Sequence, residues 1–174
     1  MNKEYYYKAT HLKNIVGEYN LQEAKLANYS SFVLEKHTGK TPSTIQAPSS
    51  FEDSKFMADL RAEFKNVRTH YLKFDPMTCY DWHTDVARNC SINFLLNDPV
   101  DSLTLFREFI EGSGHWYNIK RLKYNLFQPT LLNVREQHSV INYSQETRYV
   151  LTVGFTLDVT YMNVKRFLMF YKNS

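Results

Sequence analysis

His83 and Asp85 are the residues of this chain whose types and spacing most directly suggest chemistry. They stand two positions apart, in the hexapeptide at 80–85. On an extended strand, side chains two positions apart point to the same face, so this imidazole and this carboxylate converge, with Asp81 beside them and Tyr80 on the opposite face. Both groups are metal ligands, but in a chain with six histidines such a pair arises easily by chance. A third ligand is needed.

A third ligand and a cation follow downstream. His138 begins an extended stretch, and Arg148 opens the next strand ten positions later, after a turn. We expect a hairpin that brings the head of each strand within reach of one pocket. Two imidazoles and one carboxylate form the facial set that binds non-haem Fe(II) and leaves three coordination positions open. A 2-oxo acid and O2 can occupy these positions, and Arg148 can bind the far carboxylate of that acid bidentately.

This order of residues resembles the Fe(II)/2-oxoglutarate-dependent dioxygenase superfamily, specifically its small prolyl-hydroxylase-like and aspartyl/asparaginyl-hydroxylase-like branches. Small members of this kind are frequent in phages. The family pattern is a His-x-Asp pair, a distal His and then an Arg, as in the residues above. The resemblance covers Tyr71–Leu157 and includes Arg88–Asn97, which is similar to the second core strand of the family. The segment Asp98–Arg121 lacks the Gly-Gly pair of many prolyl hydroxylases, so the branch stays open.

The resemblance implies a double-stranded β-helix, or jelly roll, with Fe(II) held by His83, Asp85 and His138. It also implies that Arg148 binds the distal carboxylate of 2-oxoglutarate and that O2 is the second co-substrate. The activity would be hydroxylation of a C–H bond with release of succinate and CO2. Further candidates for contact with 2-oxoglutarate are Asn93, Thr152, Tyr71 and Tyr80. Arg88 is another candidate, with a surface salt bridge as its alternative role. Among these we prefer Asn93 and Thr152, because Thr152 shares a strand face with Arg148.

The substrate class stays open at this stage. A peptidyl or amino-acid side chain is our first expectation, and a nucleobase is the alternative within the same superfamily. Nucleic acid is not indicated, because the 21 Lys and Arg residues, against 18 Asp and Glu, are spread along the chain. A chain this short leaves little room for substrate-recognition insertions, so a partner subunit, such as a second copy in a homodimer, could complete the pocket.

Other functions remain compatible with the same fold. The main alternative is a non-catalytic jelly-roll binding or structural module, in which the three ligand candidates are ordinary polar residues. Arg148 argues against this alternative, since a cation at the mouth of a barrel strand needs an anion. A cupin-type metalloprotein is less favoured, because its His-rich first motif with a Glu and flanking glycines is missing. An oxygenase relative that has lost activity is a third alternative.

Length and composition limit the number of domains and the class of protein. The 174 residues fit one domain, and 43% hydrophobic with 22% charged residues is typical of a soluble globular protein. The first nine residues carry no apolar run, and no stretch is long and apolar enough to span a membrane. Two cysteines make no disulfide framework, so we expect a cytoplasmic protein, or one of the host cytoplasm if a phage encodes it. The aromatic content of 16% favours strands.

The predicted elements follow the hydrophobic period. Residues 1–70 read as a helical support region, with helices at Leu21–His37 and Phe51–Arg68, whereas the period of two from 71 to 160 indicates the jelly-roll core. The fold class is therefore mainly β with flanking N-terminal helices. Residues 161–174 form a closing helix or strand. The predicted strands are Met77–Asp85, Asn89–Leu96, Leu103–Phe109, His115–Ile119, Lys123–Phe127, Leu131–Val134, His138–Asn142 and Arg148–Val159.

Overall fold

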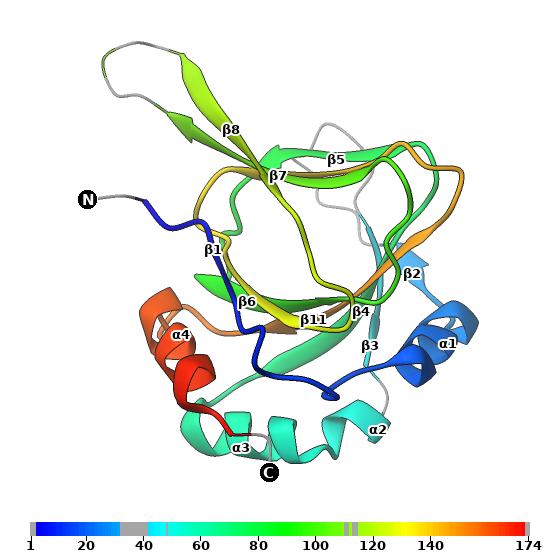
Figure 1. The fold of residues 1–174 in the computed structure, drawn as a ribbon, viewed down its shortest axis with the longest axis vertical. Helices are drawn as coiled ribbons and strands as arrows, with labels where there is room; N and C mark the ends of the chain where they lie inside the picture. The colour runs from blue at the N-terminus through cyan, green and yellow to red at the C-terminus, as the bar shows by residue number, and fades with distance from the viewer. Residues whose placement is uncertain (1–2, 32–41, 48, 110–111, 113–114, 173–174) are drawn as a thin grey trace.

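The computed structural model describes residues 3–31, 42–47, 49–109, 112 and 115–172. Two antiparallel sheets face each other, one with the strand order β1-β9-β6-β11-β4-β3-β2 and the other with β5-β10-β7-β8 (Figure 1). From β4 onward the chain passes repeatedly between the two sheets, as in a double-stranded β-helix. The predicted fold class, mainly β with flanking helices, is confirmed.

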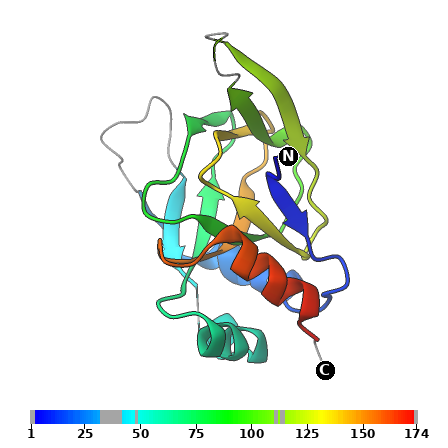
Figure 2. The ribbon, with the colours of Figure 1, turned by 90° about the vertical axis from the view of Figure 1, so that its left-hand side faces the viewer.

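The elements are short, and their bounds define the two sheets. The larger sheet contains β1 (Tyr6–Lys8), β2 (Ser30–Ser31), β3 (Ser43–Gln46), β4 (Arg68–Phe74), β6 (Cys90–Leu95), β9 (Pro129–Asn133) and β11 (Arg148–Gly154). The smaller sheet contains β5 (Thr78–His83), β7 (Ser102–Phe109), β8 (Trp116–Leu122) and β10 (His138–Asn142). The helices are α1 (Glu18–Leu26), α2 (Ser49–Glu52), α3 (Lys55–Glu63) and α4 (Tyr161–Phe170). Figure 2 shows α4 lying across the larger sheet.

Alternation along the central strands of the larger sheet divides the core into two layers. On β6, Ile92 and Phe94 join the cluster that packs beneath the helices, whereas Leu95 joins the cluster between the two sheets. On β11, Leu151 and Val150 divide in the same way. This is the result of a side-chain period of two on strands that are covered on both faces. The helices therefore cover the outer face of the sheet and leave its inner face to the site.

Both predicted N-terminal helices differ from the observed ones. The helix expected at Leu21–His37 ends at Leu26, where the Tyr29 hydroxyl donates to the Ala24 carbonyl (2.8 Å) and Ala27 becomes extended. The part of that prediction from 32 to 37 lies outside the described residues. The helix expected at Phe51–Arg68 is two helices, because Ser54 caps α3 by accepting a hydrogen bond from the Met57 amide (3.3 Å).

The first 70 residues, for which we predicted helical support, also supply strands to the larger sheet. The connection at Thr38–Ser50 contains β3, which pairs with β4, and its Ser-Thr-Ile-Gln sequence carries no apolar alternation that would reveal a strand. The expected strand Lys123–Phe127 is wrong, because β8 ends at Leu122 and Phe127 has a positive φ of 59°. The closing segment, for which helix and strand were both open, is helix α4.

No helix in the described part of the chain is long and apolar enough to cross a membrane. The homodimer stays a prediction.

Packing beneath the helices gives a prediction about stability. Phe94 is fully buried and meets Phe51 and Phe56 edge to face, with ring centroids 5.9 and 6.0 Å away. We expect Phe94→Ala to lower the free energy of unfolding by about 3–5 kcal/mol, because it removes buried surface and leaves a cavity. Urea denaturation measures the loss, with Met162→Ala on the exposed face of α4 as control. A change below about 1 kcal/mol in Phe94→Ala would contradict this packing.

Candidate metal centre

His83, Asp85 and His138 lie together at one end of the space between the sheets. One ligand atom from each residue lies within 4.8 Å of the other two. His83 Nε2 is 3.7 Å from Asp85 Oδ1, and the two imidazole centroids are 4.1 Å apart. Both histidines are buried, at 5% and 6% exposure. The cluster is therefore a compact, enclosed set of two imidazoles and one carboxylate, and its chemistry fits a divalent transition metal.

Pairing between β5 and β10 brings the two histidines together. His83, the last residue of β5, is the register partner of His138, the first residue of β10. Asp85 lies two residues after the end of β5. Its amide donates to the carbonyl of Val134 (2.9 Å), which lies in the segment that leads into β10. Residues far apart in sequence thus meet because two strand ends are paired.

A bulge in β5 overturns one of our predictions. Val140 pairs with Tyr80 and His138 pairs with His83, so two steps along β10 match three steps along β5. The extra residue reverses the alternation of side chains. Tyr80, expected on the face opposite His83, instead lies beside it with ring centroids 3.8 Å apart. Burial and the nearby Asp85 raise the pKa of Tyr80 to about 12. Tyr80 therefore borders the cluster as a neutral phenol.

Main-chain carbonyls orient both imidazoles. His83 Nδ1 donates to the carbonyl of Asp81 (2.6 Å), and His138 Nδ1 donates to the carbonyl of Glu136 (2.9 Å). A proton on Nδ1 leaves the Nε2 lone pair directed at the ligand cluster, which is the arrangement found around metal-binding histidines. We expected Asp81 to support the ligands from the same face. The contact with His83 comes from its main chain, while its carboxylate accepts a hydrogen bond from the Trp82 amide (2.7 Å).

Electrostatics keep the ligand groups in their metal-binding forms. Burial raises the pKa of Asp85, but Arg88 outweighs it, with help from the two histidines, and holds this pKa below its usual range. Arg88 Nε forms an ion pair with Asp85 Oδ2. Burial lowers the pKa of His138, so its imidazole is neutral at pH 7. A neutral imidazole beside an ionised carboxylate is the state that a metal requires.

Arg148 is a buried cation at the other end of the same space. Its side chain is 2% exposed; Nη1 donates to Ser102 Oγ (3.1 Å) and Nη2 donates to Thr104 Oγ1 (2.9 Å). The buried Nε has no hydrogen-bond partner, and no carboxylate of a described residue forms an ion pair with Arg148. Burial lowers its pKa. A buried guanidinium without a counter-ion costs free energy, so an anion bound there would be stabilising.

We predicted that His138 and Arg148 begin the two strands of one hairpin, and this prediction is wrong. β10 and β11 belong to different sheets, and the chain crosses between them. Asn142, at the far end of β10, donates to the carbonyl of Phe74 (3.0 Å), which is the register partner of Arg148. Arg148 therefore lies near the end of β10 that is opposite to His138, which suits a ligand that reaches from one to the other.

A line of polar side chains lies between these two ends. Asn93 and Thr152 are register partners on β6 and β11, and Thr152 Oγ1 donates to Asn93 Oδ1 (2.7 Å). Asn93 Nδ2 donates to the Tyr124 hydroxyl (3.5 Å), and the Tyr124 ring centroid is 5.3 Å from the Arg148 guanidinium carbon. Burial raises the pKa of Tyr124. Asn93 and Thr152 thus connect through Tyr124 to the cation.

Sequence reasoning missed Ser102, Thr104 and Tyr124. Ser102 and Thr104 alternate with apolar residues on β7, a pattern that could have placed both hydroxyls on the inner face. Tyr124 lies in an irregular segment after β8, where no period exists to reveal it. Tyr71, in contrast, lies outside the site, because it packs beneath the helices and its hydroxyl donates to Glu23 Oε2 (3.0 Å).

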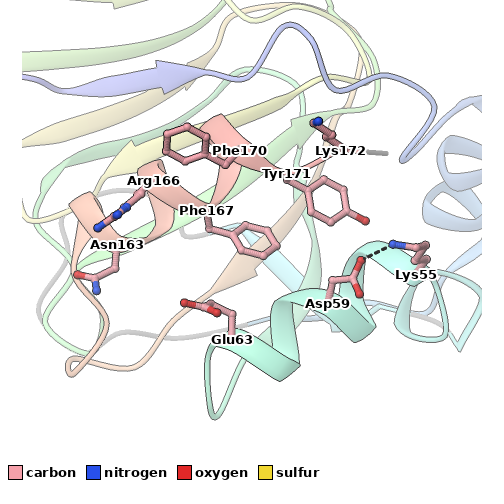
Figure 3. Close-up of a pocket in the computed structure, with 9 residues that line it drawn as sticks. All are labelled: Lys55, Asp59, Glu63, Asn163, Arg166, Phe167, Phe170, Tyr171 and Lys172. Atoms are coloured by element: carbon pink, nitrogen blue, oxygen red, sulfur yellow. Dashed lines mark hydrogen bonds and ion pairs between the residues drawn. The ribbon is translucent and has the colours of Figure 1, made fainter. Parts of the chain in front are cut away.

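A groove lies on the surface, and its lining contains none of the residues of this centre. It is an open groove of about 590 Å³ between α3 and α4, lined by Asp59, Glu63, Arg166, Phe167 and Phe170 among others (Figure 3). None of the ligand candidates borders it. We assign it no part in the chemistry.

Comparisons with known proteins identify the fold. No family model and no curated protein sequence matches the chain. A prolyl-4-hydroxylase from Pseudomonas putida superposes with a TM-score of 0.59 at 17% identity, covering 87% of this chain and 91% of that one. A Trichoplax adhaerens prolyl hydroxylase in complex with a hypoxia inducible factor peptide fragment gives 0.55 at 10% identity, covering 89% and 79%. HygX from Streptomyces hygroscopicus, with nickel and 2-oxoglutarate bound, gives 0.54 at 9% identity, covering 84% and 81%. The chain therefore has the fold of prolyl hydroxylases and other 2-oxoglutarate-dependent oxygenases.

Proposed function

We propose that this protein is an Fe(II)- and 2-oxoglutarate-dependent dioxygenase that hydroxylates a C–H bond. The observation that carries the proposal is the buried Arg148, which forms no ion pair with a carboxylate in the described part of the chain and lies near the end of β10 opposite to the His83, Asp85 and His138 cluster. A dicarboxylate with a chelating 2-oxo group fits both ends. A non-catalytic binding module would not require both the three ligand candidates and an unpaired buried arginine.

Fe(II) at the three-residue cluster would supply coordination positions for the 2-oxo acid and O2, so that oxidative decarboxylation accompanies hydroxylation. The overall reaction converts substrate C–H, 2-oxoglutarate and O2 into substrate C–OH, succinate and CO2. His83, Asp85 and His138 would hold the metal, and the Asp81 and Glu136 carbonyls fix both imidazole orientations.

The surrounding residues bind and orient 2-oxoglutarate in this proposal. Arg148 binds the distal carboxylate, and the Ser102 and Thr104 hydroxyls already hold its guanidinium in place. Asn93 and Thr152 flank the body of the co-substrate. Tyr80 packs against His83 and excludes water from the ligands, while Arg88, whose contact with 2-oxoglutarate stays a prediction, orients Asp85 through its ion pair.

For the substrate we propose a peptidyl or amino-acid side chain. Two of the compared structures are prolyl hydroxylases, one with a peptide fragment bound. No observation in the described structure favours a nucleobase.

The first prediction concerns metal and co-substrate binding. We expect anaerobic addition of Fe(II) and then 2-oxoglutarate to produce the visible metal-to-ligand charge-transfer band of a chelated 2-oxo acid. His83→Ala and Asp85→Ala should lose Fe(II) binding, whereas Arg148→Ala should keep the metal and weaken 2-oxoglutarate about 100-fold, because it removes a bidentate ion pair. Titrations followed by absorbance give both affinities. Equal loss of Fe(II) in all three variants would contradict the separate roles.

A second prediction follows from the cost of the unpaired cation. Without ligand, Arg148→Met should unfold at the same or a higher temperature than the wild type, because it removes a buried charge that has no counter-ion. Glutarate, which has both carboxylates but no 2-oxo group, should raise the melting temperature of the wild type only. Differential scanning calorimetry checks both. Strong destabilisation of Arg148→Met in the absence of ligand would show that the cation already has a partner.

A third prediction concerns the two hydroxyls that hold the guanidinium. Thr104→Val keeps the shape of the side chain but removes the oxygen that accepts from Arg148 Nη2. We expect the KM for 2-oxoglutarate to rise by about three- to tenfold, because the cation loses one fixed hydrogen bond. The matched control is Thr10→Val, at an exposed position after β1. An unchanged KM in Thr104→Val would remove this residue from the carboxylate pocket.

A further inference from the structure

Arg68, His70 and Arg88 meet at the end of β11, beside the metal ligands. Arg68 and His70 lie on β4, as register partners of Gly154 and Thr152. Arg88 comes from the segment between β5 and β6, and its Nη1 lies 3.2 Å from the position that a Cβ on Gly154 would occupy. The glycine thus lets the guanidinium lie against β11, where a larger residue would press on it.

The hydrogen-bonding capacity of these three side chains is mostly unused. Arg88 Nε pairs with Asp85, but both Nη groups lack a hydrogen-bond partner in the described part of the chain. Arg68 is exposed and His70 is half-buried, and within the same part neither side chain forms a hydrogen bond or an ion pair. A partly enclosed group of donors without acceptors favours an anion.

The charge balance around the group points the same way. Burial, then Arg88, then Arg68 lower the pKa of His70, which shows that both guanidinium groups act on it. Glu52 is the acidic residue that opposes them, and it is already paired with Arg61. Asp85 pairs with Arg88, but a bound metal would draw on the same carboxylate and leave more positive charge uncompensated.

2-Oxoglutarate does not account for this group in the proposed function. One of its carboxylates is assigned to Arg148 and the other to the metal. We infer that Arg68, His70 and the Nη groups of Arg88 form a subsite for an oxyanion, a carboxylate or a phosphate, that the primary substrate carries near the carbon to be hydroxylated. The subsite itself rests on the geometry alone, whereas its assignment to a substrate rests on the proposed function.

The test is a binding titration of the full chain without metal. Inorganic phosphate and N-acetyl-aspartate amide serve as probes for the two oxyanions, and NMR follows the His70 ring and the Gly154 amide. We expect saturable shifts with at least one probe. That probe should bind about tenfold more weakly in Arg68→Gln, which removes the positive charge, and in His70→Asn, which removes the distal ring nitrogen. Arg166→Gln, which removes an exposed arginine of α4, is the matched control and should bind as the wild type does.

The outcomes separate the subsite from the chemistry. Stronger binding of phosphate indicates a phosphorylated substrate, and stronger binding of the aspartate derivative indicates an acidic side chain. Unchanged affinity in Arg68→Gln and His70→Asn, or displacement of the bound probe by 2-oxoglutarate, would overturn the inference. The charge-transfer band of Fe(II) and 2-oxoglutarate should persist in Arg68→Gln. If the wild type binds the probe but never forms that band, the subsite stands and the oxygenase proposal fails.

Discussion

The pairing of the end of β5 with the start of β10 is the constraint on which the metal cluster depends. It sets His83 opposite His138, and Asp85, two residues after His83, lies beside both. Because main-chain hydrogen bonds fix this register, the three ligands are positioned without a metal to gather them. The bulge in β5 places the Tyr80 ring against His83, on the same side as the cluster. A slip by one residue would send the imidazoles to different faces, so the chemistry is tied to strand register.

The opposite end of the barrel shows how the fold tolerates a cost that serves binding. Arg148 could be stabilised by a carboxylate on a facing strand, yet the described residues offer hydroxyls from Ser102 and Thr104 and the ring of Tyr124 instead. Neutral acceptors hold the guanidinium in position but do not neutralise it. A carboxylate there would stabilise the protein and, in the proposed function, would block the co-substrate. The electrostatic cost of the unpaired charge is therefore local, and a bound anion would relieve it.

The sequence predicted that His83, Asp85 and His138 come together, as they do in the structure, better than it predicted the elements around them. Strict alternation made β6 and β11 recognisable, and the inward face of Thr152 followed from the position of Arg148. The side of Tyr80 could not be predicted, because a bulge depends on the partner strand and leaves no local signal. The expected β10–β11 hairpin failed for a related reason, since a turn of that length can equally cross between sheets. β3 stayed hidden because its pairing with β4, and not its own composition, makes it a strand.

Asp85 links the candidate metal cluster to the group of Arg68, His70 and Arg88, because Arg88 and a metal would act on the same carboxylate. Without metal, Arg88 keeps Asp85 ionised and holds it in place. In the proposed function a divalent ion would share the carboxylate charge, so Arg88 and Arg68 would attract an oxyanion more strongly than without the metal. Such coupling is reciprocal, so an anionic substrate would in turn favour the metal-loaded form. The ion pair would thus couple the two binding events, so that each favours the other whichever comes first.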